Sequence, residues 1–260
     1  MKRLFVVVVL IILCLCTAHA AEISLRSDAW CPYSCDPASD KPGILVEVAR
    51  RIFQRAGHTV DYQDLNWARA IEEVREGRHD GLVDTYKSDA PDFVFPEEPI
   101  MISRMCFFVK EDDPWEYKDY NSLQDRHVSV VNSYSYGESF DDYIKKNEGK
   151  GNRIIQTLCG MDLTPRRITQ MATGQIDTIL EDCLVFPYQV AGHKDLPAMR
   201  TLKGFRNAGC LPGVELFIAF SPGKASSRGY ADLITQGVRD MRASGELDEI
   251  VKGYANHPSP

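Results

Sequence analysis

The sequence predicts an α/β fold in which two modest lobes each hold a mainly parallel sheet covered by helices on both faces. Strand-like apolar segments alternate with amphipathic helical segments along nearly the whole chain. The 260 residues are 44% hydrophobic and 26% charged, an ordinary globular composition that can bury a large core. Alternating strands and helices are typical of parallel sheets, and this length suits two lobes better than one very large sheet.

The first residues predict a cleavable secretory signal. A basic pair at residues 2–3 precedes an apolar stretch at 4–15, and Ala18-His19-Ala20 has the small residues that a signal peptidase reads. The apolar stretch is shorter than the roughly 20 residues needed to span a bilayer. Neither cysteine of this segment follows Gly, Ala or Ser, which argues against lipid attachment. We therefore expect residues 1–20 to be removed and the protein to be free in the periplasm.

The next part of the chain predicts three strands that alternate with two helices. Strand patterns occupy residues 23–26, 59–62 and 81–83. Apolar residues recur at helical spacing over 44–56, and Gly57 provides the stop. Asn66 can cap a second helix that ends at Gly77. The buried stripe of that helix is Trp67, Ala70, Ile71 and Val74.

The second half of the chain repeats the alternation. An apolar strand at 105–109 is followed by the acidic, proline-containing break at 111–114, where we expect the chain to cross between lobes. Further strands are expected at 128–131, 153–157, 176–180 and 214–220. Further helices are expected at 135–145, at 165–173, just after residue 183, at 230–241 and, after Gly245, through residues 250–254.

Charge and cysteines exclude several classes of protein. The net charge of −7 and the lack of a basic run argue against nucleic acid as a partner. Six cysteines follow the signal, and in an oxidising compartment they predict disulfides with 15 possible full connectivities. Cys31 and Cys35 can bridge across a turn, and a long-range Cys159 to Cys210 pairing is a further hypothesis. No CxxC pair or histidine at ligand spacing occurs, so we expect neither a metal nor a cofactor.

Several short motifs occur in a defined order and spacing along the chain. They are Trp30-Cys31-Pro32-Tyr33, Gly43-Ile44-Leu45-Val46-Glu47, Asn66-Trp67-Ala68-Arg69-Ala70, Glu76-Gly77-Arg78-His79-Asp80-Gly81, Phe95-Pro96-Glu97-Glu98-Pro99, Val128-Ser129-Val130-Val131 with Ser133-Tyr134-Ser135, the stretch from Gly174-Gln175-Ile176-Asp177 to Asp182, and Ser244-Gly245-Glu246-Leu247-Asp248-Glu249-Ile250. Together they resemble the extracellular solute-binding proteins of family 3, the polar amino-acid binding proteins that feed ABC importers.

This resemblance implies a type II periplasmic binding protein, a two-lobed clamp of the Venus-flytrap kind whose chain crosses twice between lobes. Lobe 1 would comprise residues 21–109 and 209–260, and lobe 2 would comprise residues 110–208. A small polar solute would bind in the cleft, close the hinge and create the surface that a membrane partner recognises. We expect such a clamp to be a monomer.

The resemblance also implies cleft residues in the second lobe. Asp182 stands where the family places the carboxylate that holds a ligand's ammonium group, although it could equally cap the following helix. Ser133, Tyr134 and Ser135 lie between a strand and a helix. Free backbone N–H groups there suit an anion, and a plain helix cap is the alternative.

The first lobe departs from the family pattern. Members that bind α-amino acids usually carry an arginine six residues before the Phe of the Phe-x-x-Pro region, and here that position is Asp89. Lys87 or Arg69 could replace this carboxylate clamp, or each could be an ordinary surface cation. Alternatively, Asp84 and Asp89 face the cleft and the ligand is cationic or neutral.

Aromatic residues stand at strand ends or helix starts on the expected cleft side. These residues are Trp30, Tyr33, Trp67 and Tyr86. They could stack on a planar group or hold a cation over a ring face, and core packing is the alternative, above all for Trp67.

Binding of a small polar solute for an ABC transporter permease is therefore the expected function, with no catalytic residue. A membrane sensor could take the place of the permease. The same fold also resembles periplasmic dehydratases, in which Glu181 or Asp182 would supply the acid, but the missing arginine removes the carboxylate clamp. No GxSxG, HExxH, Walker or dinucleotide motif occurs.

Overall fold

The computed structural model describes residues 20–132, 134–147, 154–157 and 163–255. The strands are β1 (Glu22–Ser27), β2 (Thr59–Asp64), β3 (Gly81–Thr85), β4 (Met101–Ser103), β5 (Met105–Lys110), β6 (Val128–Val131), β7 (Ile154–Thr157), β8 (Thr178–Asp182), β9 (Phe205–Cys210) and β10 (Val214–Phe220). The helices are α1 (Ile44–Arg55), α2 (Trp67–Arg75), α3 (Glu138–Asn147), α4 (Thr164–Ala172), α5 (Val185–Gly192), α6 (Ser227–Ser244) and α7 (Glu246–Ala255), with 3₁₀ turns η1 (Tyr120–Leu123) and η2 (Pro197–Thr201). The expected signal, residues 1–20, lies almost wholly outside the described residues.

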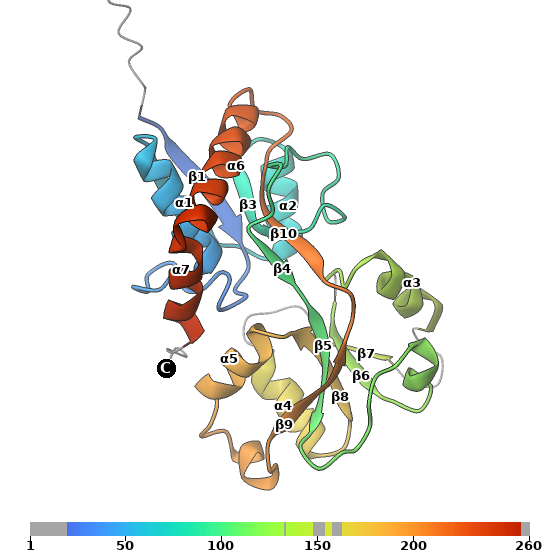
Figure 1. The fold of residues 1–260 in the computed structure, drawn as a ribbon. Helices are drawn as coiled ribbons and strands as arrows, with labels where there is room; N and C mark the ends of the chain where they lie inside the picture. Colours follow the sequence, from blue (N-terminus) through green and yellow to red (C-terminus); the bar gives the residue numbers. More distant parts are fainter. Residues whose placement is uncertain (1–19, 133, 148–153, 158–162, 256–260) are drawn as a thin grey trace, which may run out of the picture.

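Two five-stranded sheets confirm the α/β class. The first sheet has the order β2-β1-β3-β10-β4 and the second has the order β7-β6-β8-β5-β9. In each sheet the first three strands in this order are parallel to one another. The fourth strand pairs antiparallel with both the third and the fifth. We call the first sheet with α1, α2, α6 and α7 the first lobe, and the second sheet with α3, α4 and α5 the second lobe (Figure 1).

The chain passes between the lobes along two neighbouring segments (Figure 1). β4 belongs to the first sheet and β5 to the second, so the first crossing is at Arg104. The crossing expected at 111–114, after residue 109, is therefore misplaced, because the apolar run Met105–Lys110 pairs with β8 and β9. The return crossing, between β9 and β10, covers residues 211–213. Sequence analysis missed β4, with three residues, and β9, whose partly exposed residues lack an apolar alternation.

The helices of the first lobe form where the apolar spacing predicts them. α1 buries seven side chains on one face, among them Ile44 and Phe53, and Gly57 follows with φ of 83°. The Asn66 side chain accepts a hydrogen bond from the Arg69 N–H, which satisfies a free donor of the first turn of α2. Gly43 precedes α1 with φ of 118°, and a Cβ there would collide with the Tyr33 carbonyl. This close approach holds the loop after β1 against α1.

Two disulfides occur among the described residues. Cys31–Cys35 closes the loop after β1, as the short spacing predicts, and Cys106–Cys210 joins β5 to β9. The hypothesis of a Cys159–Cys210 pairing is wrong, because register places Cys210 directly opposite Cys106. Cys159 lies outside the described residues, and Cys183 is a half-buried free thiol.

Within the described part of the chain, no helix is long and apolar enough to cross a membrane. A continuous core runs under both sheets and includes Phe53 and Phe220 in the first lobe and Phe107 and Phe140 in the second.

Candidate functional site

A small cavity of about 30 Å³ lies between the two lobes. We call it the inner cavity, and it is lined by Asp28, Trp30, Trp67, Asp84, Tyr86, Asp89, Met105, Tyr134 and Ser135. Asp28 and Trp30 follow β1, Trp67 opens α2, and Tyr134 follows β6. The carboxyl ends of parallel strands meet at one edge of a sheet, which is the usual place for a ligand in open α/β sheets.

A β-bulge sets the position of Asp84. Between β3 and β10, Leu82 pairs with Ala219 and Thr85 with Phe217, so two residues of β3 face one of β10. Asp84 is the extra residue and has φ of 61°, a left-handed conformation that Asp tolerates better than most side chains. Bulges often re-aim a side chain next to a functional site. Here the bulge places the Asp84 carboxylate in the lining of the cavity.

The Asp84 carboxylate is buried and only half satisfied. The residue is 6% exposed, and its Oδ2 accepts a hydrogen bond from the Ser27 hydroxyl at 3.2 Å. Its Oδ1 has no hydrogen-bond partner among the described residues. Burial raises the pKa of Asp84 to about 8, against the opposing effect of the Ser34 and Ser27 hydroxyls.

Two more carboxylates line the same cavity. Asp28 accepts a hydrogen bond from the Tyr134 hydroxyl, and Asp89 accepts one from the Tyr86 N–H at 2.9 Å. Burial raises the pKa of Asp28 to about 6 and the pKa of Asp89 to about 7, against these hydrogen bonds. The cavity therefore combines three carboxyl groups that lack full hydration.

Direct hydrogen bonds connect the two lobes around the cavity. The Trp30 indole N–H donates to Glu181 Oε1 at 3.1 Å, and the Tyr134 hydroxyl donates to Asp28. The Tyr33 hydroxyl donates to Asp182 Oδ1 at 3.0 Å. These bonds hold the two lobes together in the arrangement that the structure describes.

A buried ion pair supports the Trp30 contact from the second lobe. Arg167 is 2% exposed, and its Nη1 lies 2.7 Å from Glu181 Oε2. The same guanidinium donates to the Leu180 carbonyl. Arg167 thus neutralises Glu181 from beneath β8, and it does not line the inner cavity.

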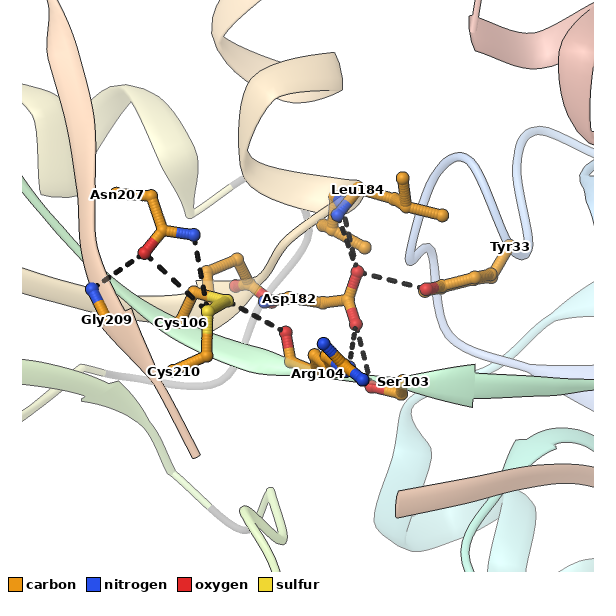
Figure 2. The surroundings of a disulfide bond; sticks show 11 residues. Tyr33, Ser103, Arg104, Cys106, Asp182, Leu184, Asn207, Gly209 and Cys210 are labelled. Atoms are coloured by element: carbon orange, nitrogen blue, oxygen red, sulfur yellow. Dashed lines mark hydrogen bonds between the residues drawn. A yellow bond between two sulfur atoms is a disulfide. The ribbon is translucent and has the colours of Figure 1, made fainter. Parts of the chain in front are cut away.

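Asp182 does not line the inner cavity, and both oxygens of its carboxylate are occupied by hydrogen-bond donors of the protein (Figure 2). Its carboxylate accepts hydrogen bonds from the hydroxyls of Tyr33 and Ser103 and from the N–H groups of Arg104 and Leu184, at 2.7–3.0 Å. Burial raises the pKa of Asp182, and these donors oppose the rise. The residue ties α5 and the first crossing to the loop after β1.

The sequence-predicted residues divide into four groups. Seven line the inner cavity: Trp30, Trp67, Asp84, Tyr86, Asp89, Tyr134 and Ser135. Tyr33 and Asp182 are fully buried and bond to each other outside it. The side chains of Arg69 and Lys87 are 66% and 56% exposed and pair with Glu73 and Glu215. Ser133 lies outside the described residues.

Sequence analysis did not select Asp28 or Met105 for the cavity. Asp28 immediately follows β1, at the same kind of strand end that pointed to Trp30, so the strand-end rule could have found it. Met105 begins β5 beside the first crossing. Its apolar strand context gave no signal for a cavity.

A second, larger hollow adjoins the inner cavity and has a volume of about 350 Å³. It shares Trp67, Asp89, Tyr134 and Ser135 with the inner cavity and extends along β6 and α3. We call it the outer groove. Its described cationic side chain is Lys145, whose ammonium lies 3.7 Å from Asp142.

The residues that the structure describes contain no group of three or more His, Cys, Asp or Glu side chains that could hold a metal ion.

The sequence model of the bacterial extracellular solute-binding proteins, family 3, matches residues 26–257. The chain belongs to this family. The match covers the second sheet, the first sheet from the end of β1 onward, both crossings and every residue of the inner cavity. As a family member the protein is a solute-binding protein of extracellular location. No curated protein matches the sequence.

Solved structures confirm the periplasmic-binding-protein fold. A histidine kinase sensor domain with similarity to periplasmic binding proteins has a TM-score of 0.70 and 19% identity, covering 92% of this chain and 98% of its own. An ancestral arginine-binding protein bound to arginine has a TM-score of 0.67 and 16% identity, covering 90% and 97%. An amino acid ABC transporter substrate-binding protein from Streptococcus pneumoniae, bound to L-arginine, has a TM-score of 0.67 and 16% identity, covering 91% and 95%.

Proposed function

We propose that the protein captures a small polar solute, an amino acid or a related amine, between its lobes and delivers it to the permease of an ABC importer. One observation carries the proposal: both lobes contribute side chains to one cavity, and direct hydrogen bonds such as Trp30 to Glu181 join the lobes beside it. Release of a solute from this cavity requires separation of the lobes.

The same contacts support a closing hinge. The two crossings, at Arg104 and at residues 211–213, are short, and backbone rotation there would open the lobes as units. A solute that contacts both lobes binds the closed form more tightly, so it shifts the population towards closure. A membrane partner can then distinguish loaded from empty protein by the surface that closure creates. The predicted signal at residues 1–20 supports action in the periplasm.

A membrane sensor is the second candidate partner. A histidine kinase sensor domain has the same fold over 92% of this chain, so this architecture also supports signalling. Uptake of a labelled ligand by cells with and without the gene separates the two partners. Loss of uptake on deletion supports the importer, and unchanged uptake supports the sensor.

A thermal-shift screen tests the proposed function. The protein is refolded from denaturant to remove any solute that co-purified with it, and then screened against amino acids, polyamines, quaternary amines, sugars and organic acids. A ligand at 100 times its Kd stabilises the native state by about 2.7 kcal/mol, which corresponds to a Tm increase of about 5–10 °C. Recovery of the ligand unchanged after incubation argues against a dehydratase. An unchanged Tm across every class contradicts the proposal.

A further inference from the structure

The inner cavity is acidic and aromatic, and its described lining has no basic side chain. Three of its residues carry carboxyl groups, Asp28, Asp84 and Asp89, and four carry aromatic rings. The rings belong to Trp30, Trp67, Tyr86 and Tyr134. Carboxylates and aromatic faces both attract cations, the rings through the negative face of their quadrupole.

Asp84 has one carboxylate oxygen that lacks a hydrogen-bond partner among the described residues. Its Oδ1 is buried and has no hydrogen-bond partner among the described residues, while Ser27 satisfies only Oδ2. A buried carboxylate with an open acceptor is unfavourable unless a donor or a positive charge completes it. A bound cation at Oδ1 would supply both.

Among the described residues, the lining of the inner cavity offers an α-carboxylate no positively charged partner. Arg69 and Lys87 are exposed and paired with other acids, and Arg167 is paired with Glu181 behind β8. A ligand carboxylate placed here would instead meet the three aspartate carboxyl groups, which are acidic and partly ionised near neutral pH. Like charges at short range in a poorly hydrated site repel strongly.

The size of the cavity favours a compact head group. About 30 Å³ accommodates a small group such as an ammonium, and the outer groove of about 350 Å³ leaves room for the rest of a molecule. The two spaces share Trp67, Asp89, Tyr134 and Ser135, so one molecule can occupy both.

We infer that the site selects a small organic cation without an α-carboxylate, whose ammonium or alkylated ammonium head lies at Asp84 between Asp28, Asp89 and the aromatic rings. This inference rests on the proposed function and narrows its ligand class. The ligand's tail extends into the outer groove past Trp67. Asp89 is part of this specificity, because it places a further carboxyl group in the lining of the inner cavity.

Matched ligand pairs test the inference by isothermal titration calorimetry. In each pair only one member has a carboxylate: ornithine and arginine carry one in addition to the atoms of putrescine and agmatine, and glycine betaine carries one in place of the hydroxymethyl group of choline. In at least one pair we expect the member without the carboxylate to bind at least tenfold more tightly. Equal or tighter binding of the carboxylated member in every pair overturns the inference, as does the absence of binding by all six compounds.

The broader screen separates failure of the inference from failure of the proposed function. Binding of a neutral sugar, an organic acid or a simple amino acid would support the proposed solute-binding function but contradict the inferred specificity for a cation. An absence of binding across every class would contradict both the proposed function and the inferred specificity.

Substitution of Asp84 tests the position of the head group. Asp84→Asn keeps the shape and tolerates the left-handed backbone, and we expect it to weaken binding of the cationic probe at least tenfold. The matched control is Asp232→Asn, which removes the same charge from an exposed position on α6. Asp89→Asn is a second variant, since its side-chain oxygen can still accept from the Tyr86 N–H. Wild-type affinity in both folded cavity variants overturns the assignment.

Discussion

Two buried aspartates, one in each lobe, show how differently the same side chain can be used. Asp84 lies near the end of β3 in the first sheet, and Asp182 ends β8 in the second. Both are at least 94% buried, and burial raises the pKa of both carboxyl groups. Asp182 accepts hydrogen bonds at both oxygens from four well-placed donors, whereas Oδ1 of Asp84 accepts none from the described residues.

The difference lies in the donors that each local structure supplies. Asp182 precedes α5, whose first N–H groups point back at it, and the first crossing adds Ser103 and Arg104. Asp84 lies in a bulge, where the strand ladder is interrupted and no helix begins. The hydrogen bonds of Asp182 stabilise the described arrangement of the two lobes, whereas Asp84 leaves one acceptor oxygen open in the cavity.

The largest expected effect is the loss of stability on removal of the Asp182 carboxylate. Asp182→Ala leaves the hydroxyls of Tyr33 and Ser103 and the N–H groups of Arg104 and Leu184 without their acceptor. Each unsatisfied buried donor costs about 1–3 kcal/mol. Ser103 keeps its hydrogen bond with the Tyr86 hydroxyl, so three donors near the lower end of that range give a loss of about 3–5 kcal/mol. Differential scanning calorimetry should record a Tm decrease of about 6–20 °C.

The exposed Asp125→Ala is the matched control in the same lobe and should leave the Tm nearly unchanged. Affinity of folded Asp182→Ala for the cationic probe should fall by no more than about tenfold, through loss of the contacts that Asp182 makes with Tyr33 and Ser103 of the first lobe. An unchanged Tm together with lost binding would contradict this structural role and would indicate that Asp182 contacts the ligand.

An intermediate effect is expected from the disulfide beside Asp182 (Figure 2). Cys106–Cys210 joins residues 104 positions apart, whereas Cys31–Cys35 spans only four. The longer loop restricts the unfolded chain more, so replacement of Cys106 and Cys210 together by Ala should cost about 2–5 kcal/mol. Urea denaturation should show a smaller loss for the control in which Cys31 and Cys35 are replaced.

The affinity of the folded protein for the cation should be the same with and without the Cys106–Cys210 bond, because Asp84 lies in the other sheet. A weakened affinity at unchanged folding would show that the two aspartates are coupled.

The smallest expected effect is a pH dependence of ligand binding. This dependence tests directly whether the Asp84 carboxyl contacts the cation. The groups near its carboxyl are Asp28 after β1, Tyr62 in β2, Asp89 after β3 and Asp182 in β8. Below its pKa of about 8 the Asp84 carboxyl is protonated, and a cation must displace that proton. Affinity should therefore rise by about tenfold per pH unit from pH 6 to pH 8 and then level off.

Calorimetry with choline measures this dependence, because a quaternary ammonium does not titrate. Buffers of different ionisation enthalpy report the proton released on binding. Asp84→Asn should flatten the profile above pH 7. An affinity of wild-type protein that stays constant from pH 6 to pH 8 would contradict the assignment of the head group to Asp84.

The sequence by itself determined the alternation of elements and the places where site residues occur. The stripe of α1, the Asn66 cap of α2 and the apolar run of β10 follow from spacing within single segments, which local physics controls. Positions at strand ends and helix starts selected Trp30, Trp67, Tyr86 and Tyr134 of the cavity residues, because parallel topology gathers such positions.

Only the tertiary structure decided which of these residues are open to a ligand. Whether Asp182 or Asp84 has a free oxygen depends on donors more than 50 positions away in the chain, among them Tyr33 for Asp182 and Ser27 for Asp84. The Cys106–Cys210 pairing and the crossing at Arg104 likewise depend on strand register across the second sheet. Hydrogen-bond saturation and register are properties of segments distant in sequence, so the pattern within any one segment does not contain them.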